Sequence, residues 1–127
     1  MNDTLFMKTL ASGSSGNATL LWCEDNCILI DAGISYRRLA KGLEGVGLSF
    51  EQVQGVLLTH EHKDHVHALP MIHRKHPDMA FWGTAGTIKG CIEEYSWAME
   101  MKRIKSGEPF YMGGLGVSPV AVSHDAR

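Results

Sequence analysis

The sequence has no long hydrophobic run and no excess of charge of one sign, and both absences narrow the class of protein. No segment approaches the roughly 20 consecutive apolar residues that a membrane-spanning helix needs, and residues 1–17 lack the basic start and apolar run of a secretory signal. We therefore expect a cytoplasmic protein without a membrane partner. The formal net charge of -2 is untypical of strongly basic nucleic-acid binders and of acidic disordered tails.

Cysteine is also scarce. Three cysteines are present, at Cys23, Cys27 and Cys91, and no two of them form the CxxC pair that zinc ribbons and redox motifs use. An odd number in a chain expected in the cytoplasm predicts reduced thiols. A disulfide between Cys23 and Cys27, across the turn-forming residues 24–26, is the alternative.

The chain of 127 residues has the length of one domain, and no repeat, low-complexity tract or linker divides it. Short apolar runs and amphipathic segments alternate, which predicts an α/β fold that begins with a β-hairpin. Strands are expected over residues 5–12, 18–23, 27–33, 55–60 and 78–84, and helices over residues 35–47, 66–77 and 85–101. The last helix rests on apolar spacing at Ile88, Ile92, Tyr95 and Met99, and the residues after it are β-like with glycine turns.

The segment GVLLTHEHKDHVHALP, residues 55–70, holds four of the seven histidines. If residues 55–60 form a strand and a helix follows, the histidines lie at the carboxyl end of that strand, where α/β sheets place their ligand crevices. His60 and His62 are two residues apart, so in an extended segment both side chains point to the same side. Asp64 and His65 follow where the chain turns, and they can approach a second ion.

Imidazole and carboxylate side chains in this pattern suit Zn²⁺, and also Mn²⁺ or Fe²⁺. Two such ions about 3.5 to 4 Å apart can share a hydroxide and stabilise charge that develops on a phosphoryl or acyl centre, so the reaction class is hydrolysis. The alternative is a solvated polar turn. The full HxHxDH pattern after an apolar strand is more specific than a single HxH pair and favours the metal site.

The HxHxDH pattern resembles the main motif of the metallo-β-lactamase superfamily. The segment ILIDAG, with Asp31 at the end of a strand, resembles an earlier motif of that superfamily, and VSHDA, with His124, resembles a later one. The opening LASGSSGNATLL is similar to the YycJ or WalJ branch of bacterial exonucleases that act on double-stranded DNA. This resemblance implies an αββα sandwich whose N-terminal part is a mixed sheet with helices on one face, and an activity on DNA or another phosphodiester.

The same resemblance implies a ligand set for two zinc ions. His60, His62 and His124 bind the first ion, and Asp64 and His65 bind the second. Asp31 lies behind the ligands and orients them, which makes Asp31 and Asp64 the catalytic candidates. Substrate-binding residues are not assigned.

The superfamily has two further metal motifs after that of His124, a bridging carboxylate and a last histidine, and neither occurs before Arg127. Residues 1–127 are therefore expected to form a single incomplete domain that lacks the C-terminal half, exposes an apolar sheet face and could pair with a second copy. We expect one metal to bind detectably, a second to bind weakly, and catalysis to be poor. Two alternatives stay open: hydrolysis of a thioester or β-lactam, and a truncated non-catalytic module.

Three weaker signals have more than one interpretation. The loop GSSGN, residues 13–17, could bring backbone N–H groups to a phosphate, although a plain turn is commoner. Arg37 and Arg38 could contact substrate phosphates, although a solvated pair near a helix start is the favoured interpretation. His67 is at most a candidate for a place behind the metal ligands.

Overall fold

A six-stranded mixed sheet is the centre of the computed structural model, which describes residues 4–60 and 62–120. The strands lie in the order β1-β2-β3-β4-β5-β6; β1 to β3 are antiparallel, and β3 to β6 are parallel. Their bounds are Phe6–Ala11 (β1), Ala18–Cys23 (β2), Asn26–Ile30 (β3), Val53–Leu57 (β4), Phe81–Gly83 (β5) and Lys102–Arg103 (β6). The predicted hairpin and the predicted α/β class are confirmed.

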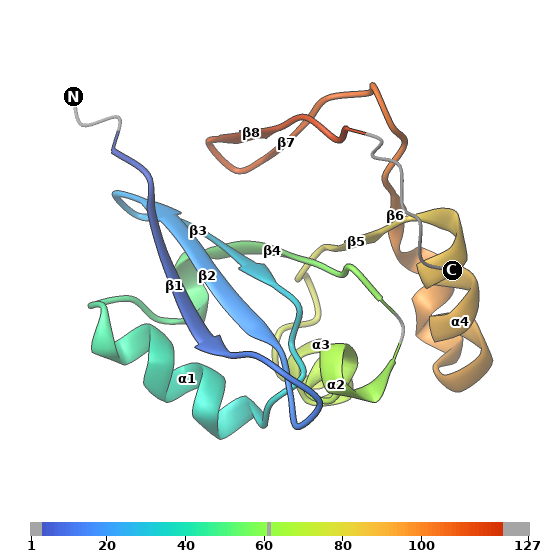
Figure 1. The fold of residues 1–127 in the computed structure, drawn as a ribbon, viewed down its shortest axis with the longest axis horizontal. Helices are drawn as coiled ribbons and strands as arrows, with labels where there is room; N and C mark the ends of the chain where they lie inside the picture. Colours follow the sequence, from blue (N-terminus) through green and yellow to red (C-terminus); the bar gives the residue numbers. More distant parts are fainter. Residues whose placement is uncertain (1–3, 61, 121–127) are drawn as a thin grey trace.

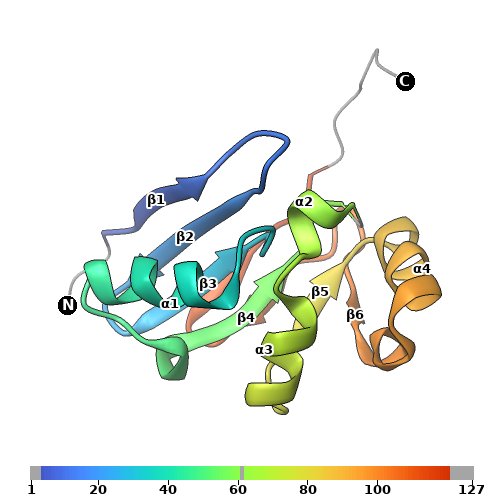
Figure 2. The same cartoon turned by 90° about the horizontal axis from the view of Figure 1, so that it is seen from below.

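Helices cover one side of this sheet, and a small hairpin lies on the other side (Figures 1 and 2). The helical elements are α1 (Tyr36–Gly45), η1 (Phe50–Gln52), α2 (Lys63–Val66), α3 (Leu69–Lys75), α4 (Ala85–Glu94) and η2 (Ser96–Glu100). The hairpin consists of β7 (Phe110–Met112) and β8 (Leu115–Val117), and its Phe110 ring stacks on Trp82 of β5 with centroids 4.0 Å apart. Within the two described ranges, no helix has both the length and the apolar character needed to cross a bilayer.

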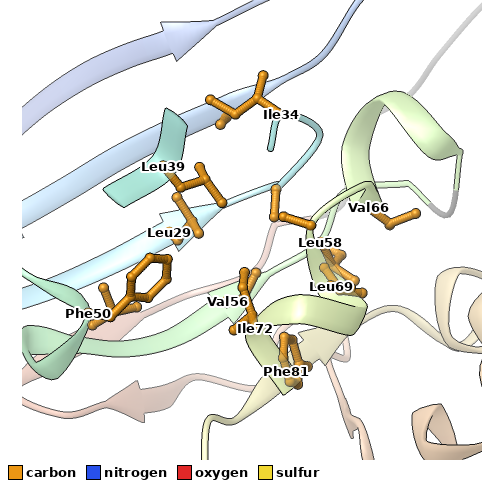
Figure 3. Packing of buried hydrophobic residues seen from close by; sticks show 14 of the residues in the cluster. Leu29, Ile34, Leu39, Phe50, Val56, Leu58, Val66, Leu69, Ile72 and Phe81 are labelled. Carbon is orange, nitrogen blue, oxygen red and sulfur yellow. The ribbon is translucent and has the colours of Figure 1, made fainter. Parts of the chain in front are cut away.

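The core lies between the sheet and helices α1 and α3 (Figure 3). Ser35 caps α1 by accepting a hydrogen bond from the backbone of Arg38, and the helix then buries Leu39 and Leu43, which lie one turn apart on the same face. Each fully buried leucine contributes about 1.5–3 kcal/mol by leaving water. This packing holds α1 and α3 against the sheet, beside the strand ends that carry the polar side chains of the candidate site described below.

The predicted helix over residues 85–101 was too long, and its predicted apolar face is only partly buried. The helix ends at Glu94, because Tyr95 is extended with φ -131° and ψ 114°. Ile88 and Tyr95 pack against the core as predicted, whereas Ile92 and Met99 are 39% and 72% exposed. The buried side chains of α4 are the smaller Thr87 and Cys91.

The predicted helix over residues 66–77 is confirmed by α3, and a separate short helix, α2, precedes it. His67 and Ala68 separate the two helices, and Pro70 lies in the first turn of α3. Proline is well tolerated there because the first helical N–H groups have no partner within the helix. α2 carries Asp64 and His65, which were expected in a turn, so its backbone belongs to the candidate site.

The three cysteines are not joined by a disulfide, and reduced thiols stay a prediction. Cys27 pairs across the hairpin with Trp22, and Cys23 pairs with Asn26. Side chains directly opposite each other share a face, so Cys23 and Cys27 point to opposite faces of the sheet. The register therefore rules out the alternative disulfide.

Burial raises the pKa of the Cys27 thiol to about 11. An unfolded chain ionises this thiol at lower pH than the folded protein does, so the folded state loses stability as pH rises from about 9 to 11. We expect the free energy of unfolding to fall less steeply over this range in Cys27→Ala than in the unsubstituted protein. Urea unfolding at several pH values measures both slopes, and equal slopes would contradict the burial argument.

Several apolar side chains are exposed on the outer strands. Phe6 and Met7 of β1 are 45% and 69% exposed, and Tyr111 of β7 is 76% exposed. These residues lie on an edge strand and on the small hairpin, where another sheet or a second copy of the chain can pack. Self-association through the sheet stays a prediction, which light scattering of the purified chain tests.

Candidate metal centre

Asp31 and Thr59 lie side by side at the carboxyl ends of the parallel strands β3 and β4. The backbone N–H of Asp31 donates to the carbonyl of Leu57 at 2.8 Å, which continues the ladder one step past β3. Thr59 donates from its backbone N–H to Asp31 Oδ1 at 2.8 Å and from its hydroxyl to Oδ2 at 2.7 Å. Asp31 is only 6% exposed, so these donors hold a buried carboxylate in one orientation.

The Asp31 carboxylate also orients His65. His65 Nδ1 lies 2.9 Å from Asp31 Oδ2, and since a carboxylate only accepts, Nδ1 carries a hydrogen. In the tautomer that binds a metal, Nε2 then has the lone pair, and it lies 3.5 Å from Asp64 Oδ2 and 3.5 Å from Asn17 Nδ2. A carboxylate behind one imidazole nitrogen, with the other nitrogen available, is the arrangement that histidine ligands of metals use.

Thr59 connects the same carboxylate to His60. The Thr59 hydroxyl donates to Asp31, so its oxygen is left to accept, and His60 Nδ1 lies 3.0 Å from it. His60 Nδ1 then carries the hydrogen, and its Nε2 has a lone pair. One threonine and one aspartate thus set the tautomers of two histidines.

The histidine rings lie close to one another. The ring centroids of His60 and His62 are 5.9 Å apart, and those of His60 and His65 are 4.6 Å apart. Imidazole and carboxylate side chains are the kind of donor that divalent metal ions use. Within residues 4–60 and 62–120, however, no three His, Cys, Asp or Glu side chains lie in an arrangement that holds one ion.

The structure brings together most of the predicted site. The hydrogen bonds, ring contacts and ion-pair distances above place five of the predicted residues at the same edge of the sheet: Asp31, His60, His62, Asp64 and His65. His124 lies outside the described residues. The assignment of these side chains to particular ions stays a prediction.

Asn17 is a site residue that the sequence analysis missed. Its Nδ2 lies 3.1 Å from Asp64 Oδ2 and 2.9 Å from the carbonyl of Gly13, while its backbone N–H donates to the carbonyl of Asp64 at 2.7 Å. Asn17 thereby closes the loop of residues 13–17, called the glycine-serine loop below, and fixes Asp64 to it. An asparagine at the end of such a loop is a typical partner for backbone groups a few residues away, and this pattern in the sequence indicates its role in closing the loop.

Gly33 lets three segments meet at this place. Its backbone N–H donates to the carbonyl of Asn17 at 2.8 Å, and Ala32 donates to the carbonyl of His65 at 2.6 Å. A Cβ on Gly33 would overlap the carbonyl oxygen of Asp64 and press on the backbone nitrogen of Asn17. The glycine after Asp31 is therefore required by the close approach of the two turns that hold Asp64 and His65.

Comparison with known proteins identifies the family. A family model described as the β-lactamase superfamily domain matches residues 26–127. The fold is similar to that of a metallo-β-lactamase from Cronobacter sakazakii, with a TM-score of 0.69 at 14% identity over 91% of this chain and 51% of that one. The chain belongs to the metallo-β-lactamase superfamily, and its fold class and mixed sheet with helices on one face are as expected.

Among curated proteins, the chain is similar to two bacterial exodeoxyribonucleases. It is 30% identical to WalJ of Streptococcus pneumoniae over 121 residues, which are 92% of this chain and 45% of WalJ. It is 31% identical to YycJ of Bacillus anthracis over an alignment of 128 positions that covers 96% of this chain and 47% of YycJ. The chain thus spans about half the length of these relatives, and the resemblance to their branch is confirmed.

Proposed function

We propose that this chain is part of a metal-dependent phosphodiesterase that cleaves DNA in the cytoplasm. The observation that carries the proposal is the contact of 2.9 Å between Asp31 and His65, which leaves His65 Nε2 available beside Asp64. Such a buried carboxylate and histidine pair serves to present a ligand to a metal. The names of the two exodeoxyribonucleases support DNA as the substrate.

The residues divide into ligands and residues that position them. We assign His60, His62 and His124 to one ion and Asp64 and His65 to the other, with zinc as the first choice and Mn²⁺ or Fe²⁺ as alternatives. When bound, such ions activate water and stabilise the negative charge that develops on phosphorus. Asp31 orients His65 directly and His60 through Thr59, and Asn17 fixes the Asp64 carboxylate.

Metal-loaded chain tested on several substrates distinguishes this function from its alternatives. We expect slow, metal-dependent cleavage of bis(p-nitrophenyl) phosphate and linear duplex DNA, and a loss of about 100-fold in His62→Ala, which removes a ligand. Hydrolysis of nitrocefin or a thioester without phosphodiester cleavage would contradict the proposal and favour the second enzymatic alternative. A chain that binds metal but cleaves none of these substrates would instead support a non-catalytic module.

A further inference from the structure

A pocket of about 430 Å³ opens beside Asp64, on the side of the site where the glycine-serine loop meets α1 and α2. The residues that line it are Ser14 and Ser15 of the loop, Gly33, Ser35, Arg38 of α1, Lys63 and Asp64 of α2, and His67. This volume lies within the range of about 300–1,000 Å³ that ligand pockets occupy. The pocket adjoins the candidate metal centre, because Asp64 belongs to both.

The charge of this pocket is suited to an anion. Arg38 and Lys63 supply two cationic groups, and neither has an ion pair with another of residues 4–60 and 62–120. Lys63 also lines a neighbouring pocket with Glu93 and Glu94, so Arg38 is the principal cation of this pocket. Asp64 is the only carboxylate of the pocket wall, so the cationic side chains outnumber it even without a bound metal ion.

The shape of the pocket is set before a ligand arrives. Asn17 accepts from the backbone of Gly13 at 3.2 Å, donates back to its carbonyl at 2.9 Å, and contacts Asp64, so both ends of the serine segment are fixed to the site. Ser35 fixes the start of α1 by accepting from the backbone of Arg38 at 3.2 Å. The hydroxyls and the two cations therefore stand on elements that are held in place.

We propose that this pocket is a binding site for a backbone phosphate of the nucleic acid, next to the phosphodiester that is cleaved. Arg38 and Lys63 are the principal contacts, and the hydroxyls of Ser14 and Ser15 add hydrogen bonds to the phosphate oxygens. Arg38 is a directional donor to phosphate, and Lys63 acts as a point charge. The inference rests on the proposed function, because a polynucleotide supplies a second phosphate next to the one that is cleaved, whereas a small ester does not.

Binding of duplex DNA to metal-free chain tests the site independently of catalysis. The probe is a fluorescein-labelled duplex oligonucleotide, and its fluorescence anisotropy is titrated in EDTA at several salt concentrations. We expect Arg38→Gln and Lys63→Gln each to weaken binding about 10-fold at low salt and to reduce the slope of log K against log salt by about 0.9, because each loses one phosphate contact. The double substitution should combine both losses.

Two exposed neighbours on α1 provide matched controls. Arg37→Gln and Lys41→Gln remove the same charge from the same helix but lie outside the pocket wall, and we expect each to change binding less than twofold. Thermal melting shows whether every variant is folded, as exposure of all four side chains predicts. Equal losses in Arg37→Gln and Arg38→Gln would overturn the proposal, because they would reveal general surface attraction instead of a site.

The outcomes separate this proposal from the proposed function. Absence of DNA binding by the unsubstituted chain would overturn the phosphate site, whatever the metal-loaded chain cleaves. Metal-dependent cleavage of bis(p-nitrophenyl) phosphate, together with unchanged DNA binding in the double variant, would overturn the phosphate site and leave the function standing. Specific loss of DNA binding without any metal-dependent cleavage would support the site and overturn the function.

Discussion

Replacing Gly33 with alanine is expected to destabilise the protein by about 1–3 kcal/mol and to abolish tight zinc binding. The added methyl group has no space, because the carbonyl oxygen of Asp64 and the backbone nitrogen of Asn17 lie where it would stand. To make room for the methyl group, the end of β3 has to move away from the turn that holds Asp64 and His65. Urea unfolding and a zinc competition assay measure the two effects.

Gly86→Ala is the matched control for this substitution. Gly86 lies inside α4 with nothing within 4 Å of an added Cβ, so alanine there should leave zinc binding unchanged. Alanine in a helix is more stable than glycine by about 0.5–1 kcal/mol, which predicts a small gain. If Gly33→Ala were as stable as Gly86→Ala and bound zinc as well, the close approach of the two turns would have no role.

Replacing Asp31 with asparagine is expected to lower zinc affinity by about 10- to 100-fold. The Asp31 carboxylate accepts from the Thr59 backbone at one oxygen and from the Thr59 hydroxyl and His65 Nδ1 at the other. An amide has only one accepting oxygen, so its NH₂ group must face one of these donors. When it faces His65, Nδ1 has to accept, and the ring hydrogen moves to Nε2, the nitrogen meant for the metal.

Two measurements check the Asp31 prediction. Competition with a chromophoric chelator gives the zinc affinity, and the nitrogen chemical shifts of the histidine ring report which nitrogen of His65 carries the hydrogen. Asp78→Asn is the control, because Asp78 is exposed and far along the chain from the cluster. Unchanged affinity and an unchanged His65 tautomer in Asp31→Asn would contradict the orienting role.

Local patterns were sufficient for most of the fold. The short apolar runs of β2, β3 and β4 and the turn-forming residues between β2 and β3 predict their elements, because the residues that determine them are neighbours in the chain. The buried face of α4 could be predicted only in part. Thr87 lies against Gly83 of β5, and this tertiary contact favours a small side chain at a position that the apolar spacing does not mark.

The candidate site likewise contains residues that local sequence predicts and residues whose roles depend on tertiary contacts. His60, His62, Asp64 and His65 are adjacent in sequence, and their spacing predicts a common location. The local pattern around Asn17 indicates that it closes its loop, but not that it contacts Asp64, 47 positions away. Gly33 could not be assigned from the sequence, since its role depends on contact with Asp64, 31 positions away. Arg37 and Arg38 looked equivalent as a pair of charges, and only the turn of α1 places one of them at the pocket.

Zinc stoichiometry of the purified chain is the most direct test of the metal centre. Equilibrium dialysis followed by elemental analysis should find one zinc per chain, its loss when His60 and His62 are both replaced by alanine, and its retention in His67→Ala. That pattern would place the ion on the residues that the HxHxDH spacing and the buried Asp31 indicate. Absence of bound zinc, manganese and iron, or equal binding by the double variant, would contradict the account.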